Sequence, residues 1–176
     1  MIILGIDPGT AITGYGVIET KNNSVKWKDC GVIATEAGAP LAERLLTIYS
    51  AIEQCLVRHK PERVAIEQAF YAKNVHTTLI LGHARGVLML AAQKSGARIA
   101  EYSPREIKKA VTGNGSAEKS QVEYMVRMIL SPPAASMPSD AYDALAAALC
   151  DFYHAGARTI VSAAGARRRQ PMGVRA

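Results

Sequence analysis

The order of the secondary-structure signals is the feature that most limits how this chain can fold. Three β-rich runs come first, at residues 2–6, 13–20 and 25–35, and they predict an antiparallel meander. From Leu41 the apolar residues follow a helical spacing, and two later apolar runs of strand length alternate with helical segments. A meander followed by such alternation predicts an α/β fold, in which helices flank a mixed five-stranded sheet.

Turn and capping residues bound the later elements. The run Ser103-Pro104-Arg105-Glu106 has the composition of a helical capping box, with proline at the first helical position. Gly156 is expected to end the final helix, so we expect one domain over residues 1–156 and a basic, disordered tail over residues 157–176. The later elements are expected as strands at 63–67 and 97–102 and helices at 75–94, 104–112, 116–130 and 140–154.

Charge is unevenly distributed along the chain. Its 176 residues include 21 Lys and Arg against 15 Asp and Glu, which gives a formal net charge of +6 at pH 7. No acidic residue follows Asp151, whereas five arginines do. The positive excess therefore lies in the C-terminal tail, and it favours a polyanionic partner such as nucleic acid.

The N-terminus and the cysteines indicate the compartment. The opening MIILGIDPGT lacks the basic region of a signal peptide, and no apolar run is expected to approach the roughly 20 residues that cross a bilayer. Cys30, Cys55 and Cys150 are odd in number and far apart, which is typical of a reduced compartment and not of a metal ribbon. We therefore expect a cytoplasmic protein without a membrane partner.

Four acidic residues are candidates for one metal site. Asp7 and Glu67 each end a predicted strand, and if the two strands are parallel neighbours their carboxylates meet at one edge of the sheet. Asp140 and Asp143 lie three residues apart at the start of a predicted helix and share a face. Carboxylates suit Mg²⁺, and a pair of such ions can activate a water to attack a phosphodiester. The pattern alone leaves open that Asp7 is a turn residue, that Asp140 only favours the helix start, and that Asp143 is its solvated partner.

The loop after Glu67 is a candidate contact for nucleic-acid bases. Phe70 and Tyr71 are two of only ten aromatic residues in the chain, and Lys73 lies beside them. Aromatic rings stack on exposed bases, and lysine meets phosphate. The alternative, in which this loop packs into the core, is equally compatible with the sequence.

Basic residues and one glycine pair suggest two further surfaces. Arg105, Lys108, Lys109 and Lys119 flank a glycine-rich turn and suit contact with a phosphate backbone, although a solvated basic face has the same composition. Gly82 and Gly86 lie four residues apart, so they share one helix face where another helix could pack closely.

Six motifs occur in order over about residues 1–154: LGIDPGT, TGYGVI, AIEQAFYAKN, LGHARGV, GSAEKSQV and SDAYDALAAAL. Together they closely resemble the RuvC family of bacterial Holliday-junction resolvases. The resemblance implies an RNase H-like fold, a homodimer, and Mg²⁺-dependent paired nicking of four-way junction DNA in recombination and repair. It implies two ions per active site, with Mn²⁺ able to substitute, and the branch-migration proteins RuvA and RuvB as partners.

The resemblance also assigns roles by motif position, while the arginine tail matches no motif. The matching positions are Asp7, Glu67, Asp140 and Asp143 for the catalytic, metal-binding carboxylates, Phe70 for the junction-stacking aromatic, Lys108 and Lys119 for the functional lysines, and Gly82 and Gly86 for the dimer helix.

Three other functions match parts of the sequence. GIDPGT also resembles the first phosphate-binding turn of sugar-kinase and actin-like ATPases, but those need two lobes and this chain has room for one. A small RNase H-like nuclease acting on RNA would share the fold, but the AIEQAFYAKN and GSAEKSQV segments argue against it. A non-catalytic junction-binding module would be expected to lack one or more of the four acids.

Overall fold

A mixed five-stranded sheet lies at the centre of the structure, a computed structural model that describes residues 1–21, 24–68, 75–132 and 137–167, with α5 side chains described as far as Ala155. The strands are β1 (Ile2–Asp7), β2 (Ile12–Lys21), β3 (Ser24–Ala34), β4 (Arg63–Glu67) and β5 (Arg98–Tyr102). The helices are α1 (Leu41–His59), α2 (Val75–Lys94), α3 (Pro104–Thr112), α4 (Lys119–Leu130) and α5 (Ser139–Arg167).

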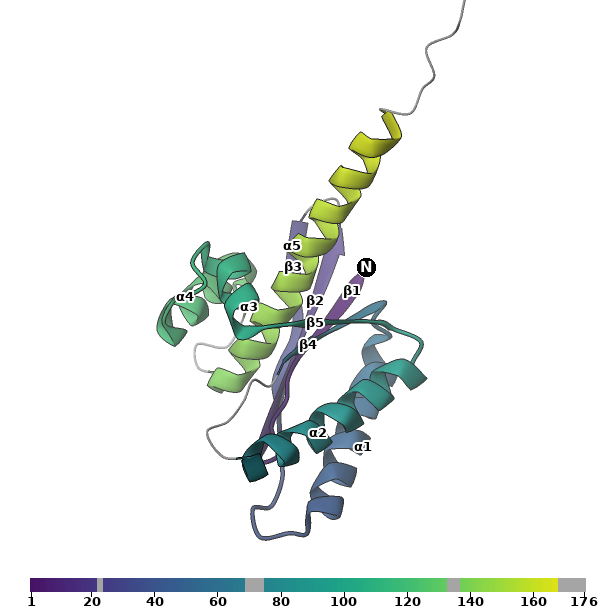
Figure 1. Cartoon of the computed structure of the whole chain (residues 1–176), viewed down its shortest axis with the longest axis vertical. Helices are drawn as coiled ribbons and strands as arrows, with labels where there is room; N and C mark the ends of the chain where they lie inside the picture. The colour runs from purple at the N-terminus through teal and green to yellow at the C-terminus, as the bar shows by residue number, and fades with distance from the viewer. Residues whose placement is uncertain (22–23, 69–74, 133–136, 168–176) are drawn as a thin grey trace, which may run out of the picture.

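The sheet has the order β3-β2-β1-β4-β5. The pairs β1–β2 and β2–β3 are antiparallel and form the predicted meander, whereas β4 pairs in parallel with both β1 and β5. Helices α1 and α2 lie on one face of the sheet, and α5 lies on the other with α3 and α4 packed beside it (Figure 1). The predicted fold class is therefore confirmed.

Side-chain alternation along the strands divides the core into two layers. On β1, Leu4 and Ile6 are buried in the cluster that packs against α1 and α2, whereas Ile3 belongs to the cluster that contains α5. On β4, Ile66 belongs to the cluster with α1 and α2, and Ala65 belongs to the cluster with α5. Odd-numbered positions of both strands therefore face α5, and this alternation places the last residue of each strand on the α5 side.

Helix α5 does not end where the sequence predicted. Gly156 was expected to close it, but the helix continues to Arg167 and spans 29 residues. A glycine inside a helix costs only about 1 kcal/mol relative to alanine. The segment around Gly156 is rich in alanine, the strongest helix former, so one glycine does not end the helix. The expected helix end at Gly156 is thus wrong, since α5 extends to Arg167, and residues 168–176 lie outside the described part of the chain.

Helix α2 differs from a second expectation. The sequence was expected to hold no segment long and apolar enough to cross a membrane. Among the described residues, α2 alone meets that criterion of length and composition. Its contacts are those of a helix packed on a folded domain. Ala84 and Leu88 are buried in the core, and Arg85 forms an ion pair with Glu101 of β5 at 2.5 Å.

Capping decides where the two short helices begin. Ser103 and Glu106 form the predicted capping box, since the backbone N–H of Glu106 donates to the Ser103 hydroxyl and that of Ser103 donates to the Glu106 carboxylate. Helix α4 begins later than expected, at Lys119 and not at Ser116. The reason is a second box, in which the backbone N–H of Glu118 donates to the side chain of Gln121 at 2.9 Å.

Candidate active site

Two acids meet at the carboxyl end of the central parallel strands. Strands β1 and β4 pair Ile6 with Ile66, so the next residue on each strand, Asp7 and Glu67, lie side by side. The sequence hypothesis depended on this pairing, and the pairing is confirmed. Both carboxylates line one cleft of about 210 Å³.

The N-terminal turn of α5 supplies the other two acids. Asp143 lines the same cleft as Asp7. Asp140 lies three residues earlier and, among the described residues, is not part of the lining, yet its charge is near enough to raise the pKa of Asp7. The four predicted acids, from three distant segments, are therefore gathered at one edge of the sheet.

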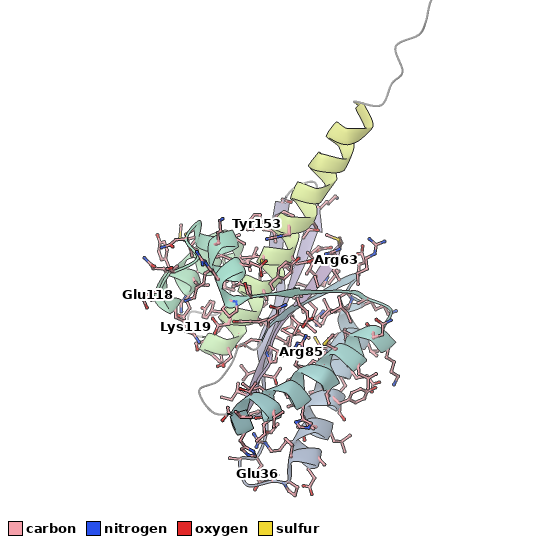
Figure 2. All side chains as sticks on the ribbon, in the orientation of Figure 1. Glu36, Arg63, Arg85, Glu118, Lys119 and Tyr153 are labelled. Atoms are coloured by element: carbon pink, nitrogen blue, oxygen red, sulfur yellow. The ribbon has the colours of Figure 1, made fainter. Side chains whose placement is uncertain are left out.

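Two lysines lie beside the acids, a placement that the sequence had not predicted. Lys119 is the first residue of α4 and lies between that helix and α5 (Figure 2), where its Nζ is 2.6 Å from Oδ2 of Asp143. Lys108 comes from α3, lines the cleft, and lowers the pKa of Glu67 through its charge. Apolar side chains form the remaining wall of the cleft, at Pro104, Ile107, Val122 and Ala146.

Burial and mutual repulsion raise the pKa values of the two strand acids, Asp7 and Glu67. Burial, followed by the charges of Asp143 and Asp140, raises the pKa of Asp7 to about 7. Burial, followed by the charges of Asp7 and Asp143, raises the pKa of Glu67 to about 8. Lys119 opposes both shifts. Both strand acids therefore keep their protons to a higher pH than an isolated carboxyl group does.

The donor set fits a hard divalent cation. All four acids offer carboxylate oxygens, the protein ligands that Mg²⁺ takes, and a cation between Asp7 and Glu67 would relieve their repulsion. Over the described ranges, no three His, Cys, Asp or Glu side chains have the spacing of a metal site. Lys119 already holds Asp143 through its ammonium group at 2.6 Å, so a metal ion at Asp143 would compete with that lysine. The donor chemistry of the four acids fits a metal ion.

A family model described as crossover junction endodeoxyribonuclease RuvC matches residues 3–151. The chain belongs to the RuvC family. The RuvC of Pelotomaculum thermopropionicum is 48% identical over 154 residues, which cover 88% of this chain and 94% of that relative. Thermus thermophilus RuvC in complex with a Holliday junction substrate has a TM-score of 0.84 at 34% identity, over 90% of this chain and 97% of that one. The yeast mitochondrial Holliday junction resolvase, 14% identical with a TM-score of 0.63, shares the fold alone.

The other predicted contacts of this RuvC-family chain are not gathered in the acid cleft. Arg105 lines a separate hollow together with Lys109 and Gly115. Gly82 and Gly86 are exposed on α2, where an added methyl group would meet no described atom within 4 Å. The base-stacking candidates Phe70, Tyr71 and Lys73 lie outside the described residues.

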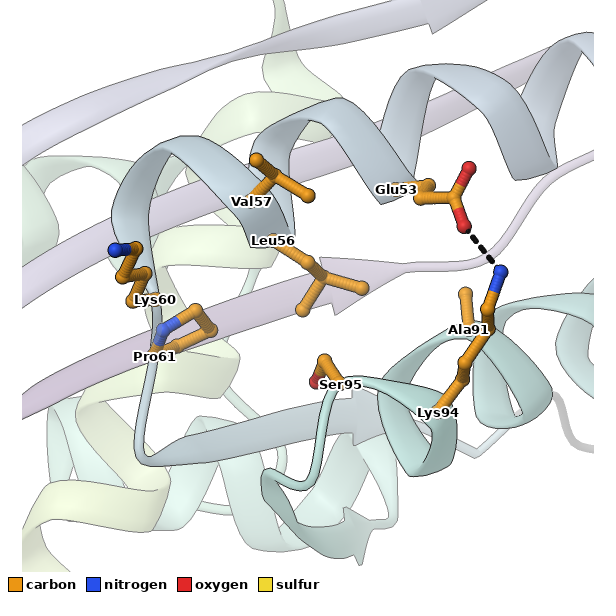
Figure 3. Close-up of a pocket in the computed structure, with 8 residues that line it drawn as sticks. All are labelled: Glu53, Leu56, Val57, Lys60, Pro61, Ala91, Lys94 and Ser95. Carbon is orange, nitrogen blue, oxygen red and sulfur yellow. Dashed lines mark hydrogen bonds and ion pairs between the residues drawn. The ribbon is translucent and has the colours of Figure 1, made fainter.

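A further hollow of about 420 Å³ lies between the C-terminal ends of α1 and α2 (Figure 3). It is lined by apolar side chains such as Leu56 and Val57, and Glu53 and Lys94 form an ion pair across it at 2.7 Å. The acids of the cleft are not among its lining residues. It therefore takes no part in the chemistry of the candidate active site.

One group of residues that shape the site was not predicted from the sequence. Three glycines lie inside β1 and β2 and face α5, at Gly5, Gly14 and Gly16. A glycine within a strand marks a bulge or a close approach of another backbone, and this signal was present in the TGYGVI motif.

Proposed function

We propose that this RuvC-family chain resolves four-way DNA junctions by cutting two phosphodiester bonds symmetrically, in recombination and DNA repair. The observation that carries the proposal is the cleft in which Asp7, Glu67 and Asp143 meet Lys119. Relatives that match most of the chain are named crossover junction endodeoxyribonucleases, and the T. thermophilus relative was solved with a Holliday junction substrate.

Divalent metal ions are the cofactor in this proposal. RuvC proteins are metal-dependent nucleases, and we propose Mg²⁺ as the ion here, two per active site, with Mn²⁺ able to substitute. Such a pair would supply an activated water and stabilise the leaving oxygen of the phosphodiester. Asp7 and Glu67 would hold both ions, and Asp143 with Asp140 would complete the ligands of one of them.

The lysines of the cleft would contact the DNA phosphate and not the metal ions. A DNA phosphate is repelled by four clustered carboxylates, and Lys108 and Lys119 place positive charge beside them. Lys119 is half exposed and can reach a phosphate that enters the cleft. Lysine contacts of this kind hold the backbone in place without reading its sequence.

Paired cleavage requires two active sites, and we propose that α2 lies at the centre of a homodimer. Gly82 and Gly86 leave room for a close helix neighbour. On the same helix, the side chains of Leu79 and Leu90 are 59% and 63% exposed. Exposed apolar side chains grouped on one face are typical of a protein–protein interface. A twofold axis through this face would give two equivalent sites for the two equivalent strands of a junction.

The remaining expectations are also part of the proposal. Phe70 would stack on a base exposed at the junction centre, and Tyr71, Lys73 and Arg105 would contact the DNA around it. RuvA and RuvB would deliver the junction, and the protein would act in the cytoplasm.

Incubation of a synthetic four-way DNA junction with the protein tests the proposal. With Mg²⁺ the junction should become two nicked duplexes, and with Ca²⁺ or a chelator it should be bound but not cut. An RNase H-like enzyme acting on RNA would instead cut an RNA-containing duplex and leave the junction whole. A non-catalytic module would bind the junction in every condition and never cut it, and either result would overturn the proposal.

A further inference from the structure

Gly14 lies where the sheet and the first turn of α5 make their tightest contact near the acids. It is the direct partner of Asp7 in the antiparallel pairing of β1 and β2, so both residues face α5. A methyl group at Gly14 would lie 2.0 Å from the carbonyl oxygen of Asp140 and 3.2 Å from its Cβ. Ordinary van der Waals contacts lie between 3.4 and 4 Å, so only a hydrogen atom fits there.

The same arrangement continues along the helix. A methyl group at Gly5 would lie 1.9 Å from the carbonyl oxygen of Ala144. One at Gly16 would lie 2.7 Å from the Cγ and Cδ2 atoms of Leu145 and 2.8 Å from its backbone nitrogen. The backbone atoms among these neighbours cannot rotate away as a flexible side chain does. The backbone of α5 therefore rests directly on the backbone of β1 and β2, and the three glycines fix its height above the sheet.

We propose that Gly14 is a positioning residue of the active site: the absence of its side chain sets the height of the first α5 turn, and so places Asp140 and Asp143 against Asp7. The inference rests on the proposed metal-dependent cleavage, which it deepens. Gly14 itself touches neither metal nor DNA in this account. It acts through the Asp140 backbone, which it contacts on the same face of the sheet as Asp7.

The distance by which a methyl group at Gly14 would displace Asp140 indicates how much metal binding and cutting should be lost. To restore ordinary contact with a methyl group, the Asp140 carbonyl would have to move by about 1.4 Å, the difference between 3.4 and 2.0 Å. Mg²⁺ requires near-ideal octahedral geometry with ligands at about 2.0–2.1 Å, and a misplacement of about 1 Å in an active site can cost roughly 100-fold in rate. Displacement of the two acids should therefore weaken the metal site strongly, whereas junction binding, which rests on many phosphate contacts, should change little.

The variant Gly14→Ala tests this, with Gly31→Ala as the matched control. Gly31 is also a strand glycine of this sheet, but its added methyl group would meet the hydroxyl of the Tyr15 side chain at 2.9 Å, and that side chain can move. Three properties are measured on the full chain: folding by circular dichroism, Mn²⁺ affinity by calorimetry, and binding and cutting of a four-way junction.

Gly14→Ala should be folded at the assay temperature and bind junction in Ca²⁺ within about twofold of wild type. Its Mn²⁺ affinity should fall at least tenfold and its cutting rate about 100-fold, while Gly31→Ala keeps both. Wild-type Mn²⁺ affinity in Gly14→Ala would overturn the inference, and so would an equal loss in Gly31→Ala. Failure of Gly14→Ala to fold even with trimethylamine oxide would also overturn it, because Gly14 would then support the fold itself. A wild-type protein that neither binds Mn²⁺ nor cuts would instead refute the proposed function.

Discussion

The ammonium group of Lys119 lies 2.6 Å from Oδ2 of Asp143, so the chain places a cation of its own against one of the four clustered acids. This contact joins the first residue of α4 to the first turns of α5. It lowers the repulsion in a cleft where Asp7 and Glu67 already carry raised pKa values. In the proposed function, a metal ion at Asp143 would compete with this lysine for the carboxylate, and a displaced Lys119 would meet phosphate.

Replacement of Lys119 by methionine should lower the cutting rate while leaving the stability of the fold nearly unchanged. The Lys119 side chain is 52% exposed, and an ion pair at such a site contributes about 0–1 kcal/mol, so the melting temperature should change little. Junction cutting at saturating DNA should fall at least tenfold, the cost of one lost charged contact of roughly 1.5–3 kcal/mol. Lys109→Met is the control, because Lys109 lies outside the acid cleft. Equal losses in the two variants would show a general effect of charge.

The raised pKa values of the two strand acids predict how metal-free stability depends on pH. A folded-state pKa of about 7 for Asp7, against 3.8 for the unfolded chain, means that the folded state holds a proton that the unfolded state has lost. Stability is therefore full below about pH 4 and falls as the pH rises toward 7 and, for Glu67, toward 8. Asp7→Asn should abolish cutting, leave junction binding intact, and raise the melting temperature at pH 8 but not at pH 4. A lower melting temperature at pH 8 would mean that the acid supports the fold.

The buried ion pair between Arg63 and Asp151 should dominate the stability of the α5–sheet interface. Asp151 is fully buried, and it accepts hydrogen bonds from Arg63 at 2.5 and 2.6 Å and from the Tyr102 hydroxyl at 2.8 Å. Arg63→Met leaves a buried carboxylate without its charge partner and should cost about 3–5 kcal/mol of unfolding free energy in urea. Arg98→Met, at an exposed position of β5, should cost less than about 1 kcal/mol.

A charge on the exposed face of α2 should disrupt the proposed dimer without affecting the monomer. An arginine at Gly82 meets no described atom in the monomer and replaces a poor helix former, so the fold should not be weakened. Sedimentation velocity should show a shift from dimer to monomer, and junctions should be nicked on one strand without the paired second cut. Gly38→Arg, in a loop with equally open space, should remain dimeric. A dimeric Gly82→Arg would place the interface elsewhere.

Phe70 offers a test that combines stability and rate. If it stacks on a base at the junction centre, Phe70→Ala should lose about 1–3 kcal/mol of stacking, which appears in the cutting rate while the melting temperature stays unchanged. If the ring is part of the core, the same change should lower the unfolding free energy by about 3–5 kcal/mol. Melting and cutting measured on one sample distinguish the two.

Much of the fold follows from local patterns. Short β-rich and apolar runs placed all five strands, and the Ser103–Glu106 capping box placed the start of α3. The start of α4 and the end of α5 were wrong, because helix ends depend on small capping and propensity differences. Gly156 was expected to end the helix, but the propensity cost of glycine relative to alanine, about 1 kcal/mol, is too small to end an alanine-rich helix.

The sequence by itself determined which residues are candidates for the chemistry: acids directly after two apolar strands, acids at a helix start, and lysines near a glycine-rich turn. Only the tertiary structure decided how these groups meet. The parallel pairing of β1 with β4 brings Asp7 beside Glu67, and glycines under α5 set the height of Asp140 and Asp143. The physical reason is that a residue's type and local conformation depend on its near neighbours in the chain. The distance between a strand acid and a helix acid more than 130 residues away depends on the packing of one backbone against another.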